Sequence, residues 1–167
     1  MMKKIWIMAV LGVALAGCGQ KKPSATASSK PKTVITTKQY TTTQLQKRYV
    51  KIVDAVVTPL DLASYSKPTA TIKQAAATGK QQIADVQLQL ASNSGQPALN
   101  RALEHLGKTA TAMLTQMVGQ DQQTYNATAK DFLSQTSTIA NTYFNGKLPT
   151  KLKVYSQRMN HDTSSRN

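Results

Sequence analysis

The stretch PALNRALEHLGKTATAMLTQMV, residues 97–118, carries the clearest pattern in the chain. Residues that recur in alternating steps of four and three share one face of an α-helix, which has ~3.6 residues per turn. Proline suits the first helical position, because its missing N–H would have no partner there. The stretch therefore predicts a helix that starts at Pro97 and buries one apolar face, formed by Leu99, Leu103, Leu106, Ala110, Met113 and Met117.

The same periodicity recurs in three further segments around this helix. The segments end at clusters that interrupt helices: Ser66-Lys67-Pro68, Ser92-Asn93-Ser94-Gly95 and Asn145-Gly146. Pro59 lies inside the first segment and predicts a bend, because proline removes a backbone hydrogen bond. The four predicted helices cover residues 43–64 (bent at Pro59), 68–91, 97–118 and 122–145.

The break between the last two helices depends on Gly119-Gln120-Asp121. A lone glycine need not stop a helix, so one long continuous rod is the alternative. Four segments of similar length favour a turn, because the middle of a longer rod would lack packing partners. Together with the short connections, they predict an all-α fold, a four-helix up-down bundle.

Polar, basic segments flank the predicted bundle. Residues 18–39 are rich in Lys, Ser, Thr and Pro, a composition typical of a flexible tether. Residues 147–167 contain five Lys or Arg and one Asp, which predicts a disordered basic tail. The expected organisation is a leader over 1–17, a tether over 18–39, a helical domain over 40–146 and a basic tail over 147–167.

The first eighteen residues have the organisation of an export signal. Lys3 and Lys4 precede an apolar run that is shorter than the ~20 residues needed to cross a bilayer. The run ends in Leu15-Ala16-Gly17-Cys18, which resembles the lipobox of bacterial lipoproteins. This resemblance implies recognition of Leu15, Ala16 and Gly17 by a signal peptidase, and a diacylglyceryl lipid on Cys18. It also implies that the protein is anchored at the extracytoplasmic face of the cell membrane.

Leader and composition together resemble the small helical surface lipoproteins of Gram-positive bacteria, lactic-acid bacteria in particular. The net charge is +14, and sixteen glutamines contrast with a single glutamate, Glu104. Outside the cell the abundant polyanions are lipid head groups and wall polymers, so we expect no nucleic-acid partner. A glutamine-rich surface also avoids repelling such polymers.

The basic tail is the candidate binding segment. Its apolar residues, such as Leu148 and Leu152, alternate with cations, so charge attraction and slight apolar insertion could act together at a membrane. The alternative is a solvated tail that only keeps the protein soluble. The residues expected to bind polyanions are Lys147, Lys151, Lys153 and Arg158.

No catalytic or metal-binding pattern is found in the sequence. His105 falls in the third predicted helix and His161 in the tail, so we expect them not to converge on a metal. Asp54 and Asp61 lie seven residues apart without a third group, and we interpret them as solvated acids. Nucleophile and phosphate-loop motifs are missing as well. We therefore expect no enzyme, no metal and no cofactor besides the lipid.

These observations favour a membrane-anchored, non-enzymatic interaction module that binds an envelope polymer or a surface protein. One alternative is an immunity or phage-exclusion lipoprotein that blocks an incoming protein. Others are a small-ligand carrier and an enzyme with an unrecognised motif. A carrier of the usual solute-binding kind would need a larger α/β chain than these 167 residues provide.

Overall fold

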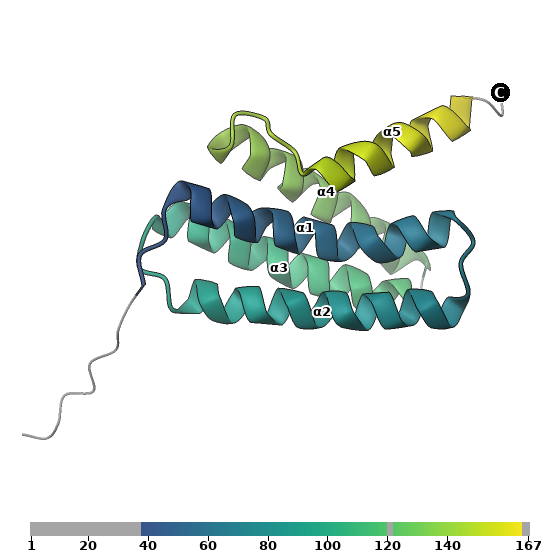
Figure 1. Cartoon of the computed structure of the whole chain (residues 1–167), viewed down its shortest axis with the longest axis horizontal. Coiled ribbons are helices and arrows are strands. Elements are labelled where there is room, and N and C mark those ends of the chain that lie inside the picture. The colour runs from purple at the N-terminus through teal and green to yellow at the C-terminus, as the bar shows by residue number, and fades with distance from the viewer. Residues whose placement is uncertain (1–37, 120–121, 165–167) are drawn as a thin grey trace, which may run out of the picture. The chain divides into compact units, whose positions relative to one another are not determined.

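A computed structural model describes residues 38–119 and 122–164 of the protein, with side chains as far as residue 161 (Figure 1). The leader, the lipobox and nearly all of the tether lie outside the described residues. Within the described ranges the chain is all-helical, without a strand. The helices are α1 (Thr42–Ser64), α2 (Thr69–Ala91), α3 (Pro97–Met117), α4 (Gln122–Tyr143) and α5 (Thr150–Ser164).

The first four helices confirm the predicted segments to within two residues at each end. Thr41 caps α1, because its hydroxyl accepts a hydrogen bond from Gln44 N while the Gln44 side chain accepts one from Thr41 N. Pro97 is the first residue of α3, as expected. Beyond α4, Asn145 and Gly146 adopt φ values of 53° and 71°, left-handed conformations that end a helix.

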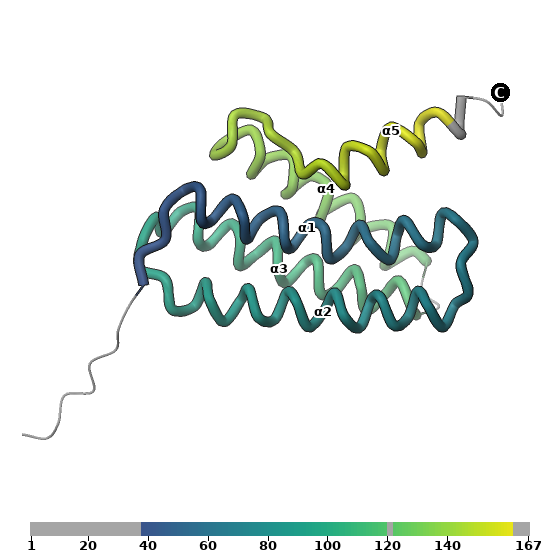
Figure 2. The backbone as a smooth tube through the Cα atoms, viewed as in Figure 1, coloured from purple at the N-terminus to yellow at the C-terminus, as the bar shows by residue number. Residues whose placement is uncertain are grey.

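Helices α1, α2 and α3 pack against one another, and α4 packs on α3 (Figures 1 and 2). Residues 65–68 connect α1 to α2, and residues 92–96 connect α2 to α3. Connections this short between long, contacting helices make consecutive helices antiparallel. The separation of α3 from α4 also confirms a turn after Met117 in place of a continuous rod.

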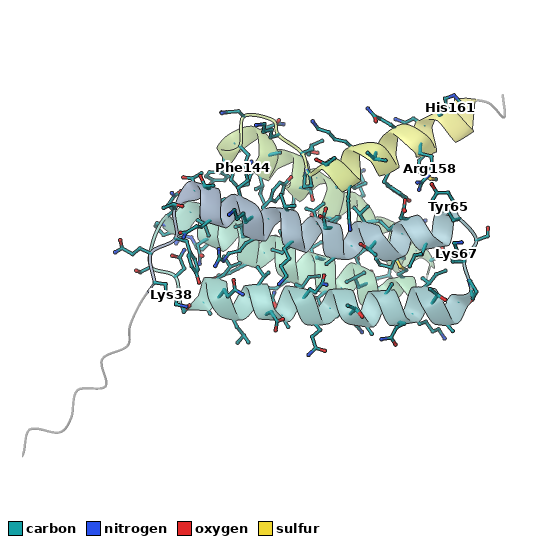
Figure 3. The ribbon with its side chains drawn as sticks, viewed as in Figure 1. Lys38, Tyr65, Lys67, Phe144, Arg158 and His161 are labelled. Carbon is teal, nitrogen blue, oxygen red and sulfur yellow. The ribbon has the colours of Figure 1, made fainter. Side chains whose placement is uncertain are left out.

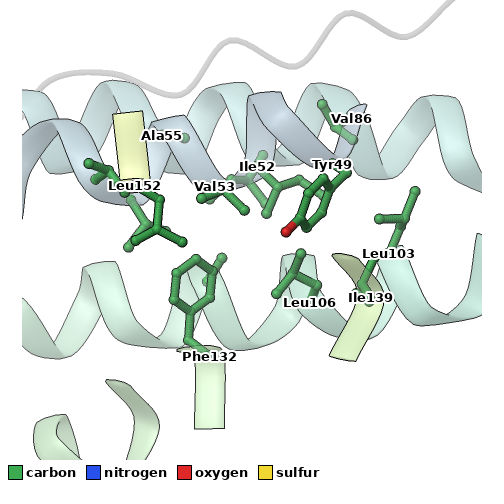
Figure 4. Close-up of a cluster of buried hydrophobic side chains, with 14 of the residues drawn as sticks. Tyr49, Ile52, Val53, Ala55, Val86, Leu103, Leu106, Phe132, Ile139 and Leu152 are labelled. Carbon is green, nitrogen blue, oxygen red and sulfur yellow. The ribbon is translucent and has the colours of Figure 1, made fainter. Parts of the chain in front are cut away.

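Tyr49 of α1 lies in the centre of the core and is completely buried (Figure 4). Its hydroxyl donates a hydrogen bond to the Thr136 carbonyl oxygen of α4 at 3.0 Å. Its ring lies 5.1 Å from the ring of Phe144, just beyond α4. Tyr49 therefore connects α1 to the far end of α4 through one polar and one aromatic contact. The fully buried side chains around it include Ile52, Val53, Leu103, Leu106 and Phe132.

Helices α1 and α2 approach each other closely at Gly79. A Cβ atom added to Gly79 would lie 2.6 Å from the carbonyl oxygen of Ala55. That oxygen would normally accept a hydrogen bond from the N–H of residue 59, but Pro59 has no N–H to donate. The helix α1 continues through Pro59, and the missing side chain of Gly79 lets α2 pack directly against the exposed carbonyl.

The prediction of a disordered tail over 147–167 is wrong for residues 150–164, which form α5. Leu152 is only 5% exposed and belongs to the same core as α1–α4. Leu148 and Tyr155 are partly buried against that core. Leu152 and Tyr155 are three residues apart and share one face of α5, while Leu148 lies just before the helix, so burial of these side chains accounts for the extra helix. The described domain therefore has five helices, one more than expected.

The chain enters α1 across the connection between α2 and α3. Lys38 N donates to Ser92 O at 3.0 Å, and Ser94 N donates to Lys38 O at 2.9 Å. The Asn93 carboxamide oxygen accepts from Tyr40 N at 2.8 Å. These contacts attach the residues before α1 to the end of the domain where α2 ends and α3 begins.

Replacing Gly79 by alanine should force α1 and α2 apart. We expect Gly79→Ala to lower the free energy of unfolding by about 1–3 kcal/mol, despite the better helix propensity of alanine. Gly107→Ala is the matched control, because its new Cβ would meet the flexible side chain of Gln87 and not the backbone. This control should be neutral or gain up to about 1 kcal/mol. Urea denaturation measures both, and equal stability of the two variants would contradict the close approach at Gly79.

Candidate functional site

The candidate site lies between α5 and α1. Arg158 of α5 reaches across to the end of α1 (Figure 3). Its guanidinium forms an ion pair with Asp61, donates to Tyr65 Oη at 2.8 Å and donates to Ser64 Oγ at 2.8 Å. It also lies 4.3 Å from the centre of the Tyr65 ring, within the range of a cation–π contact. We call this set of contacts the Arg158 clasp.

Lys151, seven residues before Arg158 on α5, is a second cation that faces α1. Lys151 Nζ donates to Thr58 Oγ1 at 3.4 Å and attracts the carboxylate of Asp54. Asp54 and Asp61 are seven residues apart on α1, and Lys151 and Arg158 are seven apart on α5. Two helical turns separate the members of each pair, so each pair shares one face of its helix. The two acids of α1 thus match the two cations of α5 in register.

Asp54 is the more enclosed of the two acids. Its Oδ1 atom is buried and has no hydrogen-bond partner among the described residues. Burial raises the pKa of the Asp54 carboxyl above its ordinary value, and the nearby Lys151 ammonium offsets part of this increase. By contrast, the side chain of Asp61 is 39% exposed and is bonded directly to Arg158.

Two clefts lie beside the contact between α5 and α1. One, of about 390 Å³, lies at the start of α5 and is lined by Asp54 together with Lys147, Lys151 and Lys153. The other, of about 400 Å³, is lined by Val57 and Leu62 of α1, by Tyr65 just after α1, and by Val154 and Arg158 of α5, among others. The first is rich in cations. The second has an apolar lining beside the Arg158 clasp.

The structure brings together the four residues that the sequence predicts to bind polyanions, but it gives them different surroundings. Lys147, Lys151 and Lys153 are exposed around the start of α5. Arg158 is only 23% exposed at its side chain, and it is engaged with Asp61. Three of the four are thus accessible to a partner, whereas Arg158 would first have to leave Asp61. Cys18, Leu15, Ala16 and Gly17 lie outside the described residues.

Sequence reasoning missed the role of the two acids. The sequence predicts Asp54 and Asp61 to be solvated acids, whereas both face cations of α5. The available signal was the seven-residue spacing that the acids share with Lys151 and Arg158. That spacing indicates a paired register only if residues 150–164 form a helix, which the sequence does not predict.

The two histidines lie on different helices. His105 lies on α3, beside a small cleft of about 250 Å³ that it lines with residues of α4. His161 lies on α5 (Figure 3). Across the described helices and loops, His, Cys, Asp and Glu side chains form no group of three or more that could hold a metal ion.

No protein-family model, curated protein or solved structure matches this chain. Within residues 38–119 and 122–164, no helix combines the length and apolar character that a membrane span requires. The functional argument therefore depends on the site itself.

The buried carboxyl of Asp54 should make stability depend on pH. Its folded-state pKa lies above the unfolded-state value, so the folded protein binds the proton more tightly, and stability falls as pH rises through that interval. We expect Asp54→Asn to be more stable than the wild type at neutral pH, with the difference closing below about pH 4. Urea denaturation across pH measures this.

The matched control is Asp85→Asn, which removes an exposed carboxylate from α2. It should not reproduce this pH-dependent difference. A difference between Asp54→Asn and the wild type that widens on acidification would contradict the assignment.

Proposed function

We propose that this protein is a membrane-anchored, extracytoplasmic lipoprotein that acts as a non-enzymatic interaction module for anionic envelope material. The observation that carries the proposal is the cluster of exposed lysines at the start of α5, Lys147, Lys151 and Lys153. We call these residues the lysine cluster. Its partners are anionic lipid head groups or wall polymers.

The position of the lysine cluster is unfavourable for the helix itself. A helix N-terminus carries a partial positive charge from its unpaired N–H groups, so cations there reduce helix stability. The first turn of α5 has no acidic residue of its own, and Asp54 of α1 attracts Lys151 across the contact. An anionic group at this place would gain from both the lysines and the helix end, so anion binding supplies a reason for the arrangement that helix stability does not.

The anchor follows from the lipobox. Two acyl chains on Cys18 would hold the protein stably at a membrane, where a single chain gives only marginal binding. We propose that α1–α4 serve as an up-down four-helix scaffold, and that α5 is presented on α1. On this view the lipid supplies attachment, and the lysine cluster adds contact with anionic groups nearby.

Lipidation is tested at Cys18. Replacement by serine removes the sulfur that thioether formation requires, so Cys18→Ser should neither incorporate a palmitate analogue nor be processed normally. Metabolic labelling followed by gel analysis measures both. Label retained in the variant, or absent from the wild type, would exclude the anchor.

Anion binding is tested with the chain from residue 19 onward, which keeps every described helix. Replacing the lysine cluster by glutamine should weaken binding to phosphatidylglycerol vesicles by up to about 3 kcal/mol, since each basic residue near such a surface contributes about 1 kcal/mol. Added salt should weaken the wild type too. Co-sedimentation across a salt series measures this, with purified wall polymer as a second ligand.

The control for this experiment replaces Lys73, Lys108 and Lys130, which are exposed on α2, α3 and α4. It changes the net charge by the same amount without touching α5. Equal loss of binding in the two triple variants would mean that total charge, and not the lysine cluster, determines binding.

A further inference from the structure

The two halves of α5 are attached to the domain by different forces. At its start, Pro149 and Leu152 are buried, and Leu148 packs partly against the core. Apolar burial of this kind is not weakened by the screening that salt imposes on charges. Farther along, the hydrogen bonds and the ion pair from α5 to α1 come from Arg158. The first turn of α5 is thus held by packing together with the Lys151 contact to Thr58, and the later turns by the Arg158 clasp and the partly buried Tyr155.

Between these attachments lies the apolar cleft of about 400 Å³. Val154, on its α5 side, is 55% exposed, and Tyr65, on its α1 side, is 56% exposed. Leu62 also lines the cleft and is only partly buried. Little apolar contact is therefore lost if the later turns of α5 move away from α1, apart from that of the partly buried Tyr155.

The partners of Arg158 on α1 resemble a lipid head group in their chemistry. A carboxylate and two hydroxyl oxygens, from Asp61, Ser64 and Tyr65, accept all of its hydrogen bonds to α1. The phosphate of an anionic lipid offers the same kind of acceptor, and guanidinium binds phosphate and carboxylate with the same forked geometry. An anionic surface can therefore replace Asp61 without leaving Arg158 unpaired.

We propose that an anionic bilayer surface displaces the Arg158 clasp, so that α5 from Val154 onward leaves α1 and lies on the membrane. This inference rests on the proposed function, because the lysine cluster brings α5 to the surface first. Arg158 then exchanges Asp61 for a head-group phosphate, while Leu152 and Pro149 remain in the core as the pivot. The domain thus gains a second, head-group-dependent contact with the membrane.

A bilayer fits this surface better than a soluble polymer does. Val154 and Tyr155 adjoin each other on the released segment, and Arg158 follows one turn later. Valine gains from burial in an apolar phase, and tyrosine favours the membrane–water interface. A soluble polymer would satisfy Arg158 but would offer no apolar phase to either neighbour.

The experiment uses the chain from residue 19 onward, which contains no tryptophan because Trp6 is the only one in the sequence. A Val154→Trp reporter introduces a single indole at an exposed position. On phosphatidylglycerol vesicles its emission should shift to the blue and be quenched by brominated lipid, whereas phosphatidylcholine vesicles should leave it unchanged. In the Val154→Trp protein, Asp61→Ala should bind phosphatidylglycerol vesicles about fivefold more tightly than Asp85→Ala does. Loss of Asp61 frees Arg158, and one basic residue near an anionic surface contributes about that much to affinity.

The control Asp85→Ala removes the same charge from α2, so general electrostatics cannot account for a difference. Vesicle binding with unchanged indole emission, or equal affinity of the two aspartate variants, would overturn the displacement of α5 while leaving the proposed function intact. No binding to anionic vesicles at all would overturn both. A blue shift that depends on protein concentration without vesicles would overturn the proposal in favour of exchange of α5 between two copies.

Discussion

The burial of Tyr49 is the constraint that sets the positions of the last two helices. Its ring is fully buried, so its hydroxyl must find a partner inside the domain, because an unpaired buried hydroxyl is costly. The Thr136 carbonyl of α4 provides that partner, and Phe144 covers the ring. One contact lies in the second half of α4 and the other just beyond its end, and together they hold this part of the chain against α1. The turn at Asn145 and Gly146 comes next in the chain, and α5 after it packs on α1.

Charge then determines how α5 continues along α1. The chain is strongly basic, and two of its seven acids, Asp54 and Asp61, face α5. Their seven-residue spacing matches that of Lys151 and Arg158, so one register of α5 on α1 pairs both cations. Surface ion pairs contribute little to stability on average, but a mismatched register would leave a buried carboxyl at Asp54 beside no cation at all. The acids therefore specify where α5 docks more than how tightly.

The sequence predicts α1–α4 well because each has an apolar face repeated over about six turns and ends at recognisable turn residues. It fails at α5 for a physical reason. A short, polar helix whose described side chains include one buried apolar residue, Leu152, has too little apolar content for its periodicity to stand out from a solvated tail. Its formation depends on the surface that α1–α4 offer, which local sequence does not contain. The exposed lysines could be identified in advance, whereas the engagement of Arg158 by Asp61 could not, because it requires the docked helix.

The start of α5 and its later turns respond differently to a charged surface, because different interactions attach them. A negative surface potential attracts Arg158 and repels Asp61, so the same field acts on the two members of the ion pair in opposite directions. The packing of Leu152 and Pro149 does not respond to this field. A membrane that draws the lysine cluster closer therefore loosens the later turns of α5 while leaving the first turns in place. The lysine cluster, which binds the surface first, and the Arg158 clasp, which the surface displaces, thus lie close together on one helix.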